Sequence, residues 1–204
     1  MLDLRPKSDI EPDRACEVLH HELAEHRSAF EATAGSIGAG FYQALRLLET
    51  GSRRGGKLIL FGNGGSAADA QHIAAELIVR YKADRAPIAA IALTTDSSVL
   101  TACANDLGFE RLFERQVEGL GRANDVAFGI STSGNSQNVL RGLYKARTMG
   151  LSTVGLTGGT GGQMKTVCDA LIVVPTSITA RIQEMHVLIG HMLCKALESR
   201  LELV

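Results

Sequence analysis

The sequence predicts an α/β fold with a parallel sheet, and three observations lead to that prediction. Five short apolar runs are continuous rather than alternating, as in strands that are buried on both faces. Longer segments with helical spacing separate these runs, so strands and helices alternate along the chain. Many of the 22 glycines stand at the ends of the runs, where a strand gives way to a helix. This alternation predicts parallel strands joined by right-handed crossovers.

The elements follow from these patterns in chain order. The expected strands are the apolar runs at residues 57–62, 87–94, 125–132, 152–158 and 170–176. The expected crossover helices lie at residues 66–81, 99–120 with a break near Gly108, 135–149 and 162–168. Three further helices, at residues 12–33, 36–50 and 179–203, are additional to the crossovers. The apolar stripe of the last one is too broad for the surface of a small domain, which favours packing on a neighbouring subunit.

The composition excludes several classes of protein. The 204 residues are 45% hydrophobic and 21% charged with 4 prolines, which is typical of a folded globular domain. The formal net charge is −1, aromatic residues make up 4%, and tryptophan is absent. Neither a basic surface for a phosphate backbone nor a platform for stacking bases is indicated. We therefore expect no nucleic-acid partner.

Cysteine spacing and apolar run length bear on the compartment. The 4 cysteines are scattered without C-x-x-C spacing, which favours free thiols in a reducing compartment over a zinc cluster or a disulfide framework. No apolar stretch reaches the roughly 20 residues of a membrane span. Residues 1–13 carry prolines and acids in place of an apolar signal core. We expect a cytoplasmic protein that has no membrane partner.

A glycine-rich loop follows the first predicted strand. It reads GNGGS at residues 62–66 and leads directly into a helix, whose free N–H groups can bind an anion. Gly62, Gly64 and Ala67 also match a dinucleotide fingerprint loosely, with Asp96 placed to meet a ribose hydroxyl. A plain tight turn is a third interpretation. We favour the anion site because a second loop agrees with it.

The second loop reads STSGNS at residues 131–136, after the third strand and before a helix. Its hydroxyl groups at a helix N-terminus predict a phosphate cradle that uses no lysine or arginine. As the alternative, Ser133 or Asn135 is a simple N-cap. Neither loop contains a P-loop lysine, and no G-x-S-x-G elbow is present, so triphosphate chemistry and an acyl-transfer serine are not indicated. We expect no nucleotide cofactor.

Ionisable side chains recur on two of the predicted helices. His72, Glu76 and Arg80 are spaced four apart, which places them near one face of a helix, where they can bind a metal or hold a base. An ordinary surface helix is the alternative, but the apolar neighbours of these residues favour a packed one. The polar residues of the last helix are Arg181, which can be an ordinary first-turn cation, Gln183, Glu184, and two histidines that can equally be packed in the core, His186 and His191.

Five motifs occur together in this chain: GNGGS at 62–66, QHIAAE at 71–76, ND at 105–106, STSGNS at 131–136 and ARIQEMHVLIGH at 180–191. In this combination the chain resembles the phosphoheptose isomerases, within the sugar isomerase (SIS) domain superfamily. The resemblance covers the chain from about residue 36 onward. It implies a homotetramer whose doubly wound, flavodoxin-like sheet has five parallel strands. It further implies conversion of sedoheptulose 7-phosphate to D-glycero-D-manno-heptose 7-phosphate, for the lipopolysaccharide and other surface polysaccharides of bacteria.

The resemblance also assigns regions and residues. Residues 1–50 become a helical segment that packs on the core and on neighbouring subunits, and residues 51–204 become the SIS domain. Glu76 becomes the catalytic carboxylate and His191 its acid–base partner. The implied substrate contacts are Asn63, Gly64, Gly65, Ser66, Glu76, Asn105, Asp106, Ser131, Thr132, Ser133, Ser136 and Gln183. The positions that hold zinc in some members, one ion per subunit, are His72, Glu76, Gln183 and His191.

Two points separate this chain from its relatives. Residues 178–180 (ITA) stand where some isomerases have an aspartate, which removes a contact to a sugar hydroxyl. A non-catalytic family of tetramers that bind the bacterial replication initiator protein shares the fold and also resembles residues 93–106. That family lacks the glutamate and the final histidine, which this chain has as Glu76 and His191. We therefore predict an enzyme, with initiator binding as the alternative.

The positions of Gln183 and His191 raise a question about the site. On one continuous helix they are separated by about 12 Å along the axis, too far to converge on one metal or one enediol. Either the helix begins after Gln183, or the two residues come from different chains that meet at a shared site. We favour different chains.

Overall fold

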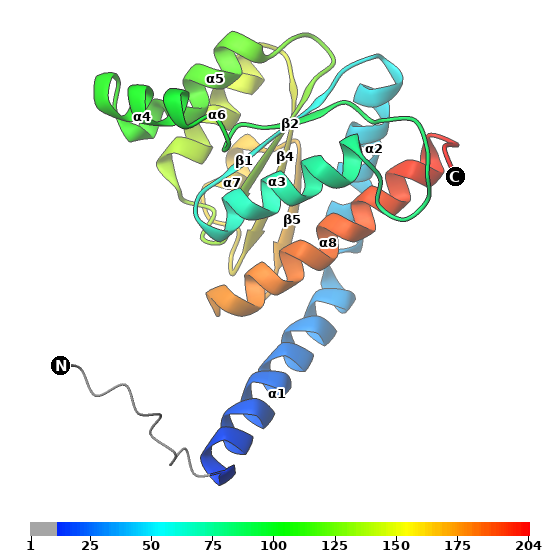
Figure 1. The fold of residues 1–204 in the computed structure, drawn as a ribbon, viewed down its shortest axis with the longest axis vertical. Helices are drawn as coiled ribbons and strands as arrows, with labels where there is room; N and C mark the ends of the chain where they lie inside the picture. The colour runs from blue at the N-terminus through cyan, green and yellow to red at the C-terminus, as the bar shows by residue number, and fades with distance from the viewer. Residues whose placement is uncertain (1–11) are drawn as a thin grey trace, which may run out of the picture.

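The computed structural model describes residues 12–204, which form one parallel sheet between two layers of helices (Figure 1). Residues 1–11, and with them most of the predicted non-apolar N-terminus, lie outside the described residues. The strands are β1 (Leu58–Gly62), β2 (Ala90–Ala92), β3 (Val126–Ser131), β4 (Ser152–Gly158) and β5 (Ala170–Val174). Their order is β2-β1-β3-β4-β5 and every pairing is parallel, which confirms the doubly wound prediction.

The helices form two layers with separate apolar cores. Leu58 and Leu60 of β1 face one core, whereas Ile59 and Phe61 face the other, because side chains alternate along a strand. Both faces are therefore covered, which explains the continuous apolar runs. The first core is formed with α2 (Gly38–Arg53), α3 (Gly65–Ile78) and α8 (Thr179–Arg200). The second is formed with α4 (Ser97–Asp106), α5 (Leu112–Leu120), α6 (Gln137–Thr148) and α7 (Met164–Val167).

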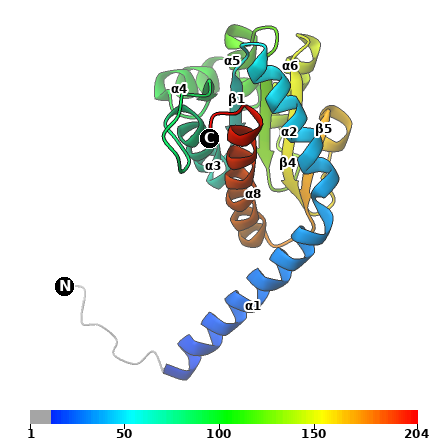
Figure 2. The same cartoon turned by 90° about the vertical axis from the view of Figure 1, so that its right-hand side faces the viewer.

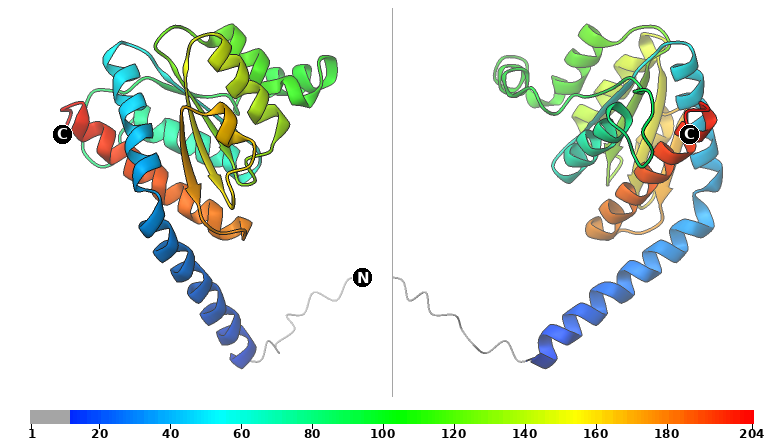
Figure 3. Two further views of the ribbon diagram at one scale, coloured as in Figure 1. Left: turned by 180° about the vertical axis from the view of Figure 1, so that it is seen from behind. Right: turned by 45° about the vertical axis from the view of Figure 1, so that its right-hand side comes forward.

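The first helix, α1 (Pro12–Ser36), differs from all the others. It projects away from the body of the domain (Figures 1, 2 and 3). Val18, Leu19 and Leu23 on it are each more than half exposed. By contrast, α2 packs its buried residue Leu48 into the core beside the sheet. Apolar side chains on a projecting helix are typical of a surface that another chain covers.

Several boundaries differ from those predicted. Strand β2 has three residues rather than the eight of 87–94, because it lies at the edge of the sheet and is only partly buried. Helix α3 ends at Ile78, so Arg80 lies beyond it and does not share a helical face with His72 and Glu76. The predicted break near Gly108 is confirmed. Gly108 has φ 92 and precedes a short 3-10 helix, η1 (Phe109–Arg111).

No helix among residues 12–204 is long and apolar enough to span a bilayer.

The burial of His186 makes the free energy of unfolding depend on pH. His186 is fully buried, and burial lowers its pKa to about 4. Between pH 6.5 and 4 the unfolded chain therefore binds a proton at this histidine that the folded chain does not bind. Acidification through this window removes about 3 kcal/mol of stability. Asp69 acts in the opposite direction, because burial raises its pKa to about 6.

We therefore expect His186→Gln to resist acid better than its parent does. Between pH 6.5 and 4 the wild type should lose about 3 kcal/mol relative to the variant, because glutamine does not titrate. Urea unfolding at equal protein concentration across this range measures the difference. Asp69 is present in both proteins, so its opposing effect cancels. Parallel stability curves for the two proteins would contradict the prediction.

Candidate active site

Helices α3 and α8 run side by side (Figure 1) and bring three ionisable side chains together. His72 and Glu76 come from α3, and His191 comes from α8. The Nε2 atoms of His72 and His191 are 2.8 Å apart, a hydrogen bond in which one ring donates and the other accepts. Oε1 of Glu76 lies 3.7 Å from Nε2 of His72. The spacing of four predicted the first pair, the family resemblance predicted His191, and the fold brings the three together.

The close packing of the two helices has a local cause. Gly190 of α8 lies against Ile73 of α3, and a Cβ at Gly190 would come within 2.8 Å of the Ile73 side chain. The glycine therefore allows the helix axes to approach. Each contact residue is next in sequence to one of the two histidines, so the approach at Ile73 and Gly190 carries His72 and His191 together.

The three side chains form a cluster with a donor set that zinc accepts. One ligand atom from each of His72, Glu76 and His191 lies within 4.8 Å of the others. Oε2 of Glu76 is buried and has no hydrogen-bond partner among the described residues. Two imidazole nitrogens and a carboxylate oxygen are usual ligands of zinc, with bonds of about 2.0–2.2 Å. A carboxylate whose Oε1 lies 3.7 Å from one of two facing nitrogens, and whose Oε2 has no hydrogen-bond partner among the described residues, fits such an ion.

A second set of polar groups lies at the carboxyl ends of β1 and β3, which are neighbours in the sheet. The Oγ atom of Ser131 lies 3.0 Å from Oγ of Ser136 and 3.5 Å from Oγ of Ser133. Ser136 is the N-cap of α6 but makes no side-chain capping bond. Neither Ser133 nor Asn135 occupies the cap position, so the simple N-cap interpretation does not hold. The hydroxyl groups surround a helix N-terminus, as an anion site requires.

Asn138, in the first turn of α6, links the helix that follows the second loop to the first loop, and it was not predicted from the sequence. It exchanges two hydrogen bonds with Asn63, in which Nδ2 of each amide donates to Oδ1 of the other at 2.8 and 2.9 Å. Asn138 also accepts a hydrogen bond from the backbone N–H of Val139. The only available signal was its place two residues after the STSGNS motif.

The chain is similar to known sugar-phosphate isomerases along most of its length. The SIS domain family model matches residues 23–158. A phosphoheptose isomerase from Paramagnetospirillum magneticum is 51% identical over 181 residues, which cover 89% of this chain and 94% of that protein. This chain belongs to the phosphoheptose isomerase family. The isomerase from Aquifex aeolicus is 55% identical over 152 residues, covering 74% of this chain and 80% of its own length.

Solved phosphoheptose isomerases share the fold. The structure of the enzyme from Neisseria gonorrhoeae matches with a TM-score of 0.85 and 41% identity, covering 91% of this chain and 99% of that one. The structure from Francisella tularensis matches with a TM-score of 0.87 and 33% identity, covering 91% and 98%. Family membership therefore supports the prediction of an enzyme.

Within one chain, the predicted site residues fall into separate groups. His72, Glu76 and His191 form the cluster between α3 and α8. Asn105 and Asp106 end α4, in the opposite layer of helices, and Nδ2 of Asn105 donates to Asp106 at 2.7 Å. The group at the ends of β1 and β3 comprises Asn63, Gly64, Gly65, Ser66, Ser131, Thr132, Ser133 and Ser136.

Gln183 belongs with the loops rather than with the cluster. Its side-chain amide lies so close to Gly65 that a Cβ there would collide with it. Helix α8 begins at Thr179 and continues to Arg200, so the alternative in which a helix begins after Gln183 is excluded. Gln183 and His191 of one chain are therefore about 12 Å apart along the helix.

Three other polar residues that the sequence analysis considered have structural roles in the fold. Asp96 caps α4 by accepting a hydrogen bond from the N–H of Val99 at 3.0 Å, which removes support for the dinucleotide interpretation. His186 is packed in the core. Arg181 is not an ordinary first-turn cation, because it is buried and pairs with Glu22 of α1 and Glu184, each at 2.8 Å.

Proposed function

We propose that the chain converts sedoheptulose 7-phosphate to D-glycero-D-manno-heptose 7-phosphate. The observation that carries the proposal is the cluster of Glu76 with His72 and His191, in a chain that is 51% identical to a phosphoheptose isomerase. An aldose–ketose isomerase needs one group to move a carbon-bound proton and another to move protons on oxygen. A carboxylate and an imidazole meet both needs.

The loops at the ends of β1 and β3 bind the substrate phosphate in this proposal. The hydroxyl groups of Ser131, Ser133 and Ser136 donate to its oxygens, and the N-terminus of α6 contributes favourable N–H groups. Asn138 holds Asn63 and so fixes one loop relative to the other. No lysine or arginine is needed, which suits a monoester that must also be released.

The proton transfers follow from the positions of the two acid–base groups. Glu76 accepts the proton from C1 of the ketose, and His191 donates a proton to the oxygen on C2, which gives the enediol. Glu76 then returns a proton to C2, while His191 accepts the proton from the oxygen on C1. The aldose forms and both groups regain their starting states.

Zinc is the metal that the donor set fits, with His72, Glu76 and His191 of one chain as ligands and Gln183 of another chain as the fourth. When bound, zinc would polarise the substrate carbonyl and favour the enediolate charge. In that case Glu76 is held as a ligand rather than acting as the base, and the zinc content of the Glu76→Gln variant separates these two roles.

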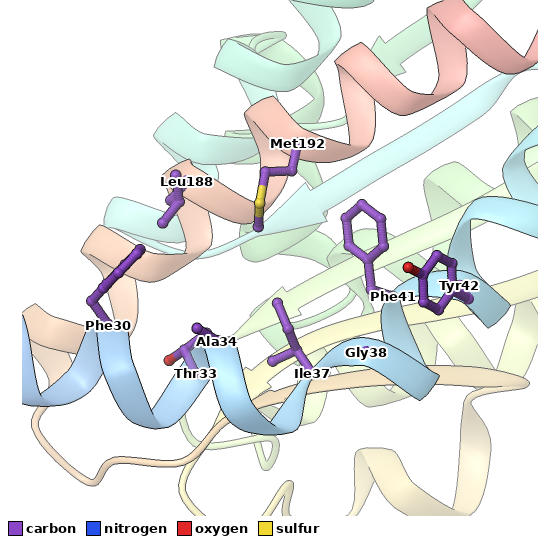
Figure 4. Close-up of a pocket in the computed structure, with 9 residues that line it drawn as sticks. All are labelled: Phe30, Thr33, Ala34, Ile37, Gly38, Phe41, Tyr42, Leu188 and Met192. Carbon is purple, nitrogen blue, oxygen red and sulfur yellow. The ribbon is translucent and has the colours of Figure 1, made fainter.

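We propose that the working enzyme is a homotetramer. A groove of about 340 Å³ opens between α1, α2 and the outer face of α8 (Figure 4). It continues the exposed apolar side of α1, and such surfaces favour a second copy of the chain. The residues that line it are Phe30, Thr33, Ala34, Ile37, Gly38, Phe41, Tyr42, Leu188 and Met192. Association would let Gln183 and the loops of one chain face the cluster of another.

The cytoplasm is the proposed compartment, and the heptose of bacterial surface polysaccharides is the proposed destination of the product. The cysteines Cys16, Cys103, Cys168 and Cys194 are all free thiols, which fits a reducing compartment. Burial raises the pKa of both Cys168 and Cys194 to about 12, so these two thiols stay protonated and unreactive.

The substrate proposal is tested with a panel of ketose phosphates, followed by NMR. We expect sedoheptulose 7-phosphate to be isomerised faster than five- and six-carbon ketose phosphates. Incorporation of deuterium from solvent at C2 of the product would report the enediol. Turnover of a shorter ketose phosphate with higher kcat/KM would reject the seven-carbon assignment, and no turnover of any would reject the isomerase.

Ser133→Ala combined with Ser136→Ala tests the phosphate loop. We expect KM for the phosphorylated ketose to rise by up to about 100-fold with kcat little changed. The reason is that a hydrogen bond to a charged group contributes about 1.5–3 kcal/mol, while the backbone donors remain. Steady-state kinetics measures this, with Thr148→Ala at the far end of α6 as the control. An unchanged KM would place the phosphate elsewhere.

A further inference from the structure

A fully buried ion pair lies beside the last turn of α3, the helix that carries His72 and Glu76. Nε of Arg85 donates to Oε1 of Glu198 at 2.9 Å, and both side chains are 0% exposed. Arg85 stands in the segment between α3 and β2, and Glu198 stands near the end of α8. Neither residue belongs to the predicted site, and their separation of 113 positions hid the pair from sequence analysis.

Arg85 also caps the helix that carries the catalytic carboxylate. Helix α3 ends at Ile78, so the carbonyl groups of its last turn need partners from elsewhere. Nη2 of Arg85 donates to the backbone carbonyl of Glu76 at 2.8 Å, and Nη1 donates to that of Leu77 at 2.7 Å. A cation at the end of a helix is favourable for its dipole as well. The guanidinium group therefore holds the backbone of Glu76 itself.

Glu198 connects the same group to the helix of His191. It lies seven positions, about two turns, after His191, so the two residues share one side of α8. Its Oε1 atom also accepts a hydrogen bond from the N–H of Tyr81 at 3.4 Å. The Tyr81 ring packs against the His191 ring, with centroids 5.2 Å apart. The ion pair therefore touches both helices and the segment that covers the histidine.

The energetics of buried pairs favour a role in geometry rather than in stability. Removing two charges from water costs several kcal/mol per ion, and replacing a buried pair by uncharged residues is often neutral for stability. A forked guanidinium does, however, fix direction and distance in a way that apolar packing does not. At an active site a displacement of about 1 Å can cost on the order of 100-fold in rate.

We propose that Arg85 and Glu198 are positioning residues, which hold the last turn of α3 on α8 and thereby set Glu76 against His191. The proposal rests on the proposed isomerase function for its kinetic readout, but its structural readout is independent of the reaction.

The test compares two double variants of the full chain. Arg85→Met with Glu198→Gln removes both charges of the buried pair. The matched control is Lys57→Met with Asp125→Asn, which removes both charges of another ion pair. In that pair Nζ of Lys57 lies 2.5 Å from Oδ2 of Asp125, next to the start of β1. Each protein is assayed for kcat and KM with sedoheptulose 7-phosphate, and the crystal structures of the wild type and both variants are determined.

We expect the Arg85 and Glu198 variant to stay folded, with kcat about 10- to 100-fold lower and KM within about twofold. Its crystal structure should show Glu76 displaced from His191. Arg85→Lys, which keeps the charge but not the fork, should recover part of kcat. The control should match the wild type in both measurements.

Three results would overturn the proposal. One is an unchanged kcat and an unchanged position of Glu76 in the folded variant. Another is a loss of kcat that the control shows equally. The third is that none of three variants folds: the double variant, the single variant Arg85→Lys and the single variant Glu198→Gln. The pair would then be required for folding rather than for positioning Glu76. If the wild type isomerises no ketose phosphate, the proposed function fails, while the position of Glu76 still decides the role of the pair.

Discussion

Glu76→Gln is expected to lower kcat about 1,000-fold while KM changes by only a few-fold. Positioned proton transfer contributes about 10²–10⁴ in rate, and an amide has nearly the shape of a carboxylate but cannot accept the proton. Glu76 suits this role because its Oε2 is buried with no hydrogen-bond partner among the described residues, which leaves that oxygen available to accept the proton. Steady-state kinetics and substrate binding by calorimetry measure the two expectations separately.

The control for this variant is Glu114→Gln on α5. The Glu114 side chain is 20% exposed against 19% for Glu76, and it lies in an ion pair with Arg111 in the opposite helical layer. It should retain full turnover. If Glu76→Gln instead kept most of its turnover, the enzymatic role of the cluster would be rejected. Metal analysis of the inactive Glu76→Gln variant separates the two roles. If Glu76 is the base, the variant keeps its zinc; if Glu76 is a zinc ligand, the variant loses zinc as well as activity.

The fold was largely predictable because its determinants are local. A continuous run such as LILFG requires burial on both faces, and the change of spacing between runs marks each crossover helix. The predicted element boundaries were wrong where contacts with the rest of the fold determine the boundary. Strand β2 is short because it forms an edge. Helix α3 ends three residues before the predicted boundary, so the spacing of four that correctly paired His72 with Glu76 does not extend to Arg80.

The site was predictable only as far as spacing and motifs reach. His186 and His191 lie on the same apolar helix, and their spacing alone does not distinguish the buried one from the one that faces α3; only the family resemblance selected His191. Asn138 and Arg85 have partners 75 and 113 positions away, so no local pattern identifies them. Asp96 matched a cofactor motif yet serves as an N-cap, because the same carboxylate chemistry suits both roles.

Mixed tetramers of Gln183→Ala and His191→Ala chains are expected to recover activity that both parents lack. A site composed from two chains would draw Gln183 from one and the cluster from another. In a mixture of equal parts about a quarter of such sites would then receive two intact halves. The parents should retain a few per cent of wild-type activity at most. Differently tagged chains are co-expressed, and tetramers that carry both tags are isolated in two affinity steps.

The informative control is a mixture of Glu76→Gln and His191→Ala chains. These two residues lie in one cluster of a single chain, within 4.8 Å together with His72, so mixing cannot restore both in the same site. Activity in the first mixture and none in the second would mean that one chain supplies Gln183 and another chain supplies the whole cluster of His72, Glu76 and His191. Activity in both would mean that the cluster itself is shared between chains. Inactivity of the first mixture would mean that one chain builds the whole site, which would require α8 to bend or break between Gln183 and His191, where it is continuous in the structure.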